Sequence, residues 1–331
     1  RLPVRRQSAA PSPPVIPVAP VAHRPMVQCP SRAAPAALRR VERHQPAAPA
    51  SPAAPVAPPR WSNAPRGGPG ADTATVATAG AFTVDGETTR QVGIRSRGLG
   101  SRSGEKPGLK VDFNKYVSGQ EFHGYKSVVL DNITQDPSMM RELLANSIFE
   151  SVGIAAPQIA FCRLTINTDF WGLYTLIEAV SKPFLKARLG EESGTLFDYE
   201  YAEDYRFTYK GEGSATYSPA PFEPQTNEGK LDTGLAEFIR AINQTPQSGY
   251  AAAMEAYIDV RKFLTYLAVE NACAEYDGMV GQFGMNNFYL YQYGGQKKFV
   301  FIPWDKDTSF QAAEWPVQYR MDTNEFTKRL M

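Results

Sequence analysis

Residues 287–307 read NFYLYQYGGQKKFVFIPWDKD, and this stretch decides the fold expected for the chain. Two apolar and aromatic runs, FYLYQY and KKFVFIPW, flank Gly294-Gly295. This pattern predicts two antiparallel strands joined by a tight turn. In such a hairpin the start of the first strand lies beside the end of the second. Asn287 and Asp305 are therefore expected to meet at one edge of a sheet.

Another oxygen donor leads into the same edge. Asp277 follows a helix predicted from Asp259 to about Tyr276, and a loop with three glycines connects it to Asn287. We expect these side chains to converge with Asp305 and Asp307, and oxygen donors are the ligands that Mg²⁺ prefers. The order of an Asp, an Asn, a hairpin and a second Asp parallels that of protein kinases. The sequence leaves a second interpretation open, in which these acids only form turns.

A glycine-rich turn upstream predicts a phosphate-binding loop. Two alternating strands, around residues 92–94 and 109–113, are joined by a turn that runs from Gly98 to Lys106. Its glycines allow backbone N–H groups to surround a phosphate. Five basic residues lie beside it: Arg95, Arg97, Arg102, Lys106 and Lys110. An arginine-rich surface turn is the alternative explanation, because the pattern is not GxGxxG.

A helix is predicted over 136–152, with Asp136 as its N-cap and Gly153 as its stop. Its apolar stripe is expected to be Met140, Leu143, Leu144 and Ile148. Glu142 lies on the same helix and is the candidate for the carboxylate that a kinase-like site pairs with a lysine, and a solvated glutamate on the helix surface is the alternative.

A strand hairpin is predicted from QIAFCRLTIN (158–167) and FWGLYTLIEAV (170–180), turning at Asn167–Asp169. A later helix is predicted with an apolar face made of Leu235, Phe238, Ile239 and Ile242. Strands first, then helices, then a late hairpin indicate the α+β class, not a regular βαβ alternation.

Composition divides the chain in two. Residues 1–80 hold 17 of the 27 prolines, ten arginines, no lysine and two acids. Such a segment buries too little apolar surface to offset its ordering entropy, so we expect a disordered leader over 1–80 and a globular body over 81–331. Scattered arginines give only sequence-blind attraction to nucleic acid, so no specific nucleic-acid partner is expected. Neither a zinc ribbon nor a disulfide scaffold fits three widely spaced cysteines, and no apolar run predicts a membrane span.

From about Thr83 to Met331 the motifs resemble the CotH kinase family, named for a spore coat protein. A basic RxRG turn at 95–98 is followed in the family's order by four further motifs: DPSMMRE (136–142), WGLYTLIE (171–178), NNFYLY (286–291) and IPWDKD (302–307). The resemblance implies a reduced, two-lobed kinase-like fold and phosphoryl transfer from ATP to protein Ser or Thr. Because family domains continue further, it also implies that the domain over 81–331 is truncated at its C-terminus.

The resemblance assigns roles position by position. Asp277 becomes the catalytic Asp, Asp305 and Asn287 bind Mg²⁺ with Asp307 nearby, and Glu142 pairs with a phosphate-binding lysine. The remaining implied contacts to the nucleotide are Arg95, Arg97 and Gly98 on the phosphates, and Glu178 near the adenine. The family's Lys-Lys pair reads Lys106-Pro107 here, so the lysine is either Lys106 or Lys110.

Two functions follow from these assignments. The first is an active kinase that uses ATP and Mg²⁺ on a protein acceptor, such as a coat or surface protein. The second is a non-catalytic scaffold for coat or surface assembly. The family implies a spore-coat, cell-surface or exported location, and the sequence itself does not decide the compartment.

Overall fold

The structure, a computed structural model, describes residues 77–98, 101, 105–227 and 233–331. Every described residue belongs to one compact unit. The predicted leader lies outside the described residues up to position 76, and the first strand begins at Thr78. Most of the glycine-rich turn, at 99–100 and 102–104, also lies outside them.

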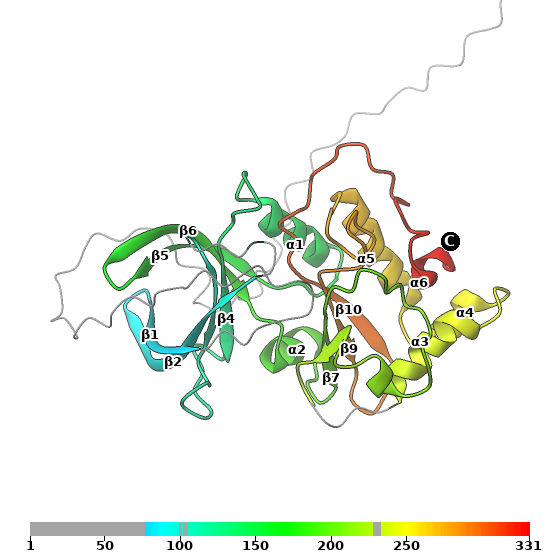
Figure 1. Cartoon of the computed structure of the whole chain (residues 1–331), viewed down its shortest axis with the longest axis horizontal. Helices are drawn as coiled ribbons and strands as arrows, with labels where there is room; N and C mark the ends of the chain where they lie inside the picture. The colour runs from blue at the N-terminus through cyan, green and yellow to red at the C-terminus, as the bar shows by residue number, and fades with distance from the viewer. Residues whose placement is uncertain (1–76, 99–100, 102–104, 228–232) are drawn as a thin grey trace, which may run out of the picture. The chain divides into compact units, whose positions relative to one another are not determined.

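The first half of the described body is a curled antiparallel sheet of six strands (Figure 1). Its spatial order is β1-β2-β3-β4-β6-β5. The strands are β1 (Thr78–Val84), β2 (Glu87–Arg97), β3 (Gly108–Asp112), β4 (Ser127–Asp131), β5 (Ile159–Ile166) and β6 (Asp169–Glu178). The predicted pairing of β2 with β3 is confirmed, and so is the β5–β6 hairpin.

The two faces of this sheet differ in character, because successive side chains along a strand point to opposite faces. One face is an apolar core that includes Val92, Leu109, Leu130 and Leu176. The other face carries a cross-strand row in which Arg95, Lys110, Val129 and Ile177 lie opposite one another. Arg97 and Asp131 follow two residues further along β2 and β4 on this second face. The polar candidates therefore share one face of the sheet.

A second antiparallel sheet has the order β10-β9-β7-β8. Its strands are β7 (Thr195–Tyr199), β8 (Phe222–Pro224), β9 (Phe288–Gln292) and β10 (Phe299–Pro303). The predicted hairpin is confirmed, with Tyr289 opposite Ile302. Val129 and Ile177 of the first sheet pack into one buried cluster with Tyr289 and Ile302 of the second. The polar face of the first sheet is thus next to the hairpin.

Helices cover the second sheet with a large aromatic core. The helical elements after β6 are α2 (Lys182–Leu189), a short 3₁₀ turn (Ser214–Thr216), α3 (Gly234–Gln244), α4 (Tyr250–Met254), α5 (Val260–Ala272) and α6 (Glu325–Lys328). The predicted apolar face of α3 is confirmed as fully buried. Asp259 caps α5 as predicted, by accepting from the Lys262 backbone N–H at 2.8 Å. The structure is therefore mixed α and β with antiparallel sheets, as the α+β prediction requires.

The helix between β4 and β5 departs from the prediction in two ways. α1 spans Arg141–Ser151, so it begins five residues later than predicted. Asp136 does not cap it directly but stabilises the preceding turn, accepting from the backbone N–H groups of Ser138 and Arg141 at 2.9 and 2.8 Å. The predicted stripe is also wrong, because Met140, Leu144 and Ile148 are 39, 46 and 37% exposed. The buried residues of α1 are Glu142, Ala145, Asn146 and Phe149.

Candidate active site

The β9–β10 hairpin brings its two polar ends together as predicted. Trp304, which follows β10, donates its backbone N–H to the carbonyl of Asn287 at 3.2 Å. Asn287 and Asp305 both adopt left-handed backbone conformations, with φ of 56° and 51°. Asn and Asp tolerate this region better than other non-glycine residues, and such strain is often found at functional sites. Both side chains are partly exposed, so the edge is open to solvent.

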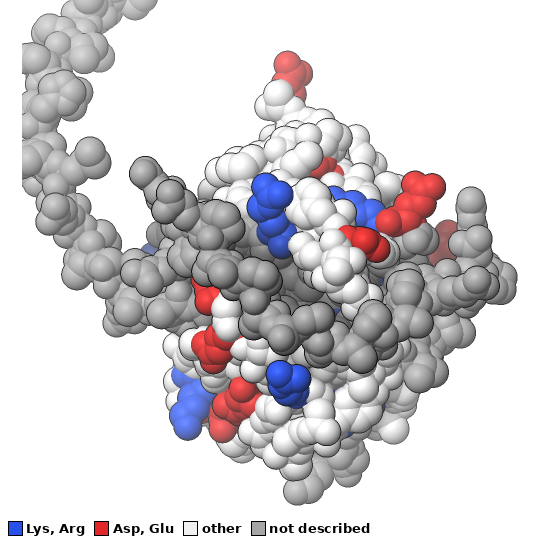
Figure 2. Space-filling view, turned by 90° about the vertical axis from the view of Figure 1, so that its left-hand side faces the viewer, with Lys and Arg blue, Asp and Glu red and all other residues white. Residues whose placement is uncertain are grey.

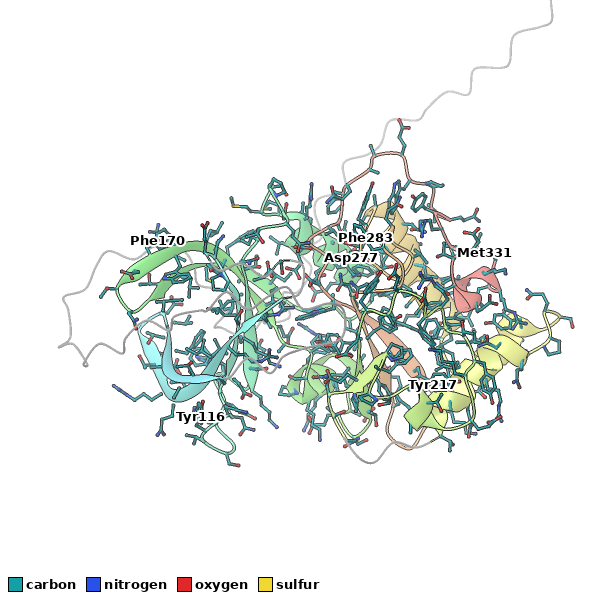
Figure 3. All side chains as sticks on the ribbon, viewed as in Figure 1. Tyr116, Phe170, Tyr217, Asp277, Phe283 and Met331 are labelled. Atoms are coloured by element: carbon teal, nitrogen blue, oxygen red, sulfur yellow. The ribbon has the colours of Figure 1, made fainter. Side chains whose placement is uncertain are left out.

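Asp277 lies directly against this edge (Figure 3). One carboxylate oxygen accepts from Asn286 Nδ2 and the other from Asn287 Nδ2, each at 3.0 Å. Its own backbone N–H donates to Glu275 Oε1 at 2.9 Å. The carboxylate is therefore fixed in position from two sides, and the predicted convergence of Asp277 with Asn287 is present in the structure.

A buried ion pair stabilises the same loop. Lys306 Nζ lies 2.7 Å from Glu270 Oε1, and each side chain is 1% exposed. Lys306 also donates to the carbonyl of Asn287 at 2.9 Å, while Glu270 accepts from the Met279 backbone N–H at 2.9 Å. Gly278 makes this approach possible, because a Cβ there would lie 2.8 Å from the Glu270 carboxyl group. The pair thus joins α5, the Asp277 loop and the end of β10.

Glu275 makes the second buried link between these segments. Its carboxylate accepts from the hydroxyls of Thr308 and Ser309, just beyond the IPWDKD motif. All three residues are buried. Glu275 also accepts from Asp277, so the position of the predicted catalytic acid depends on this network. Preorganised polar groups of this kind are typical of functional sites.

Arg97 is the centre of the charged cluster. Its guanidinium lies 3.8 Å from Asp131 and 4.0 Å from Asp305, and it stacks over the Trp304 ring at 5.4 Å from the centroid. Glu142 is the third acid whose charge acts on Arg97. The prediction paired Glu142 with a lysine. In the structure, the cation whose charge lowers the Glu142 pKa is Arg97.

The acids of this cluster repel one another. Burial, assisted by Asp131 and opposed by Arg97, raises the pKa of Asp305 to about 6. Burial and the charges of Asp305 and Asp131 raise the pKa of Asp307 to about 9. Burial, followed by the charge of Asp305, also raises the pKa of Glu142. A set of close carboxylates with one arginine has an excess of negative charge that a bound cation would neutralise.

Mg²⁺ fits this set of donors if phosphate completes its shell. No three Asp, Glu, His or Cys side chains among the described residues are arranged to hold a metal ion by themselves. Mg²⁺, however, is usually bound by one or two carboxylates together with substrate phosphates and water. Asp305 has 32% of its side chain exposed and lies at the same edge as Asn287. These two residues, with Asp307 close to Asp305, are the ones that would hold the ion.

The basic side of the site is built on the polar face of the first sheet. Lys110 lies opposite Arg95, and burial and that arginine lower its pKa. Asp198 of β7 is a further neighbour, and its carboxylate accepts from the Tyr289 hydroxyl. Burial is the main cause that raises the pKa of Asp198 to about 7. Arg95, Arg97 and Lys110 thus share one face, where three cations suit an anionic phosphate chain.

Three predicted contacts lie elsewhere. Glu178 is bound to Arg188 of α2 at 3.0 Å and to the Gln158 backbone N–H at 3.1 Å, on the apolar face of the sheet. Lys106 Nζ lies 4.9 Å from the centre of the Tyr174 ring, which belongs to that same apolar face. Gly98 has a left-handed φ of 101°, which suits the start of the glycine-rich turn, but the rest of the predicted cradle lies largely outside the described residues. The roles predicted for these residues stay predictions.

Charge elsewhere on the body is mixed. On the face shown in Figure 2, basic and acidic side chains of the described residues alternate in small patches separated by uncharged surface. No helix among the described residues is long and apolar enough to cross a membrane. Of the cysteines, Cys162 and Cys273 are free thiols, and burial raises the pKa of each to about 11, so neither is an activated nucleophile.

Comparison with known proteins defines the class. The family model described as CotH kinase protein matches residues 94–329, and the chain therefore belongs to this family. The chain is 27% identical over 223 residues to the inner spore coat protein H of Bacillus subtilis, covering 66% of this chain and 59% of that protein. It is 24% identical over 176 residues to the invasin CotH3 of Rhizopus delemar, covering 51% of this chain and 29% of that protein. The match thus spans less than two thirds of either relative.

Sequence reasoning missed several residues of the site. Asp131 is the last residue of β4 and lies beside Arg97. Its only signal in the sequence is that it is the one acid in the strand SVVLD. Glu270, Glu275 and Lys306 anchor the site, but the sequence marks the two glutamates only as positions within the helix predicted from Asp259 to about Tyr276 and the lysine only as part of IPWDKD. A lysine between two aspartates in WDKD gives no hint of burial, because lysines are almost never fully buried unless they are paired.

Proposed function

We propose that this chain is an atypical protein kinase that transfers a phosphoryl group from Mg-ATP to Ser or Thr of a protein acceptor. The observation that carries the proposal is the position of Asp277, held at 3.0 Å by each of Asn286 and Asn287 at the edge that Asp305 shares. Protein kinases carry a catalytic Asp, a metal-binding Asn and a metal-binding Asp in the same order along the chain. Membership of the CotH kinase protein family supports this assignment.

The proposed fold for this activity is a reduced kinase with two lobes. The six-stranded sheet with α1 would form the lobe above the nucleotide, and the second sheet with its helices would form the lobe that carries Asp277. The row of Arg95, Lys110 and Val129 supports this division, because it turns a basic face toward the hairpin. Lys110 is our candidate for the phosphate-binding lysine, since it shares that face with Arg97.

Each acid has a separate task in the proposal. Asp277 accepts a hydrogen bond from the acceptor hydroxyl and takes up its proton as the hydroxyl oxygen bonds to the γ-phosphorus and the bond from that phosphorus to the leaving ADP breaks. Asp305 and Asn287 hold Mg²⁺, which when bound neutralises charge on the phosphates. Arg97 orients the phosphate chain, and Asp131 and Asp305, at 3.8 and 4.0 Å, keep its guanidinium in place. Phosphoryl transfer asks mainly for this positioning and charge neutralisation.

The acceptor in this proposal is a coat or surface protein. One relative is named an inner spore coat protein, which supports a coat protein as the acceptor, and the other is named an invasin. The scaffold function remains the competing assignment. It predicts that the same fold binds no nucleotide.

Three proteins measured in parallel test the proposal. Calorimetry should show Mg-ATP binding to the wild-type chain, its loss in Asp305→Ala, and its retention in Asp277→Asn. With radiolabelled ATP, transfer to the chain itself or to a Ser/Thr-rich acceptor should fall at least about 100-fold in Asp277→Asn. Asp322→Ala is the matched control, because Asp322 is an exposed acid outside the site.

The outcomes separate the two functions. If the folded wild-type chain binds no Mg-ATP, the kinase assignment fails and the scaffold is favoured. If transfer proceeds undiminished in Asp305→Ala, the metal role of Asp305 is refuted. Circular dichroism of each variant excludes misfolding as the cause of a loss.

A further inference from the structure

A pocket on the helical side of the β9–β10 hairpin is not used by the proposed kinase chemistry. It has a volume of about 310 Å³ and lies between the start of α5, the turn of the hairpin and Ile154, which follows α1. This volume is at the lower end of the range of small-molecule sites. Asp277, Asn287 and Asp305 are not among its lining residues.

The wall of the pocket is largely apolar. Ile154, Ile258, Phe263 and Phe299 line it, and each is at most 3% exposed. Phe263 also stacks on Phe326 at 4.5 Å between ring centroids, so the wall continues into the main core. A cavity with such a wall favours an apolar ligand, because the ligand removes its own surface from water without moving the protein.

Polar groups at the rim of the pocket define the charge of the ligand. Lys298 Nζ is already committed to the carbonyls of Glu255 and Ile258. The Asp259 carboxylate is committed to the backbone N–H of Lys262, as the cap of α5. Lys262, which is partly exposed, also lines the pocket, along with Tyr293 and Gln296. The rim therefore has a positive balance and offers donors to an anion.

We propose that this pocket binds a small apolar anion, with its hydrocarbon part against Phe263 and Phe299 and its acidic group at Lys262. The proposal concerns binding only and does not depend on kinase activity. One wall residue, Tyr266, donates its hydroxyl to Glu270 at 2.8 Å, and Glu270 pairs with Lys306 below Asn287. The pocket is thus connected to the site by a continuous set of buried hydrogen bonds.

The probe for the test is 8-anilinonaphthalene-1-sulfonate, an apolar aromatic anion whose fluorescence rises in apolar sites. Titration into the folded full chain should give saturable binding at one site. Lys262→Gln should weaken it about tenfold, which corresponds to about 1.4 kcal/mol, because the charge-assisted contact to the sulfonate is lost. Arg261→Gln, the adjacent exposed charge outside the pocket, should leave the affinity unchanged.

A second variant tests the location without touching the core. Gln296 is an exposed residue of the hairpin turn at the rim, so Gln296→Trp should block entry while the protein stays folded. Octanoate should displace the probe from the wild-type chain, and octanol should do so less well. The proposal is overturned if binding is not saturable, if Lys262→Gln and Arg261→Gln bind alike, or if Gln296→Trp binds as well as wild type.

Discussion

Helices α1 and α3 have the same length, 11 residues each, but they face different surroundings. The four apolar positions predicted for α3 (Leu235, Phe238, Ile239 and Ile242) are all buried at 1% exposure or less. Three of the four predicted for α1 are exposed, and Glu142 and Asn146 are buried instead. α3 packs on an aromatic core, whereas α1 turns a polar side toward Arg97 and the acids.

The difference shows what an amphipathic pattern measures. Apolar residues at helical spacing predict the buried face only if the surface opposite is also apolar. The surface opposite α1 contains Asp131, Asp305 and Arg97, so its buried face must supply polar partners. A helix whose polar side is buried is therefore an indication of a functional site, in accord with the rule that local patterns fail where function overrides them.

The largest expected effect concerns the apolar sides of the two helices. Phe238→Ala in α3 should lower the free energy of unfolding by about 3–5 kcal/mol, because it leaves a cavity between Phe299 and Phe326. Leu144→Ala in α1 should change it by at most about 0.5 kcal/mol, because that side chain is 46% exposed. Urea unfolding of both variants measures the two values.

A large loss in Leu144→Ala would contradict the comparison, since it would place Leu144 in a core. The matched reference is Leu264→Ala in α5, a leucine that is 36% exposed at its outer surface. It should behave like Leu144→Ala, and a small effect in Phe238→Ala would equally contradict the orientation of α3.

The next effect concerns Asp198 of β7, an acid on which the charges of Arg97 and Lys110 act. Its pKa is about 7 in the folded chain, against an ordinary value near 3.8, so the folded state binds more protons between about pH 4 and pH 7. Wild-type stability therefore falls as the pH rises through this range. Asp198→Asn removes that dependence and should stabilise the chain by about 1–2 kcal/mol at pH 8, with little effect at pH 4.

The measurement is the unfolding free energy of both proteins at pH 4, 6 and 8. Asp204→Asn, at an exposed acid outside the site, provides the background for removing one negative charge. A variant that is equally stabilised at pH 4 and pH 8 would show that Asp198 does not titrate in this window.

Local patterns predicted the hairpins, the α3 and α5 helices and the meeting of Asp277 with Asn287. These features depend on short-range turn chemistry, capping and the geometry of one antiparallel pair. The position of Arg97 beside Asp131 was not predictable in this way, because it depends on the register of β2, β3 and β4 together. The burial of Lys306 was also hidden, since its partner Glu270 lies 36 residues away.

The smallest expected effect distinguishes a neutral acid from an ion pair at the centre of the site. Burial, and then the charges of Asp305, Asp131 and Asp307, raise the Glu142 pKa well above its ordinary value, and this direction favours the protonated form when no cation is bound. Glu142→Gln has nearly the shape of the protonated acid, and unfolding in urea at pH 7 should change by less than about 1 kcal/mol. If Glu142 were instead ionised against Arg97, the same substitution would leave a buried cation with one partner fewer and cost about 3–5 kcal/mol. The size of this one change therefore decides whether α1 presents a neutral or a charged group to the site.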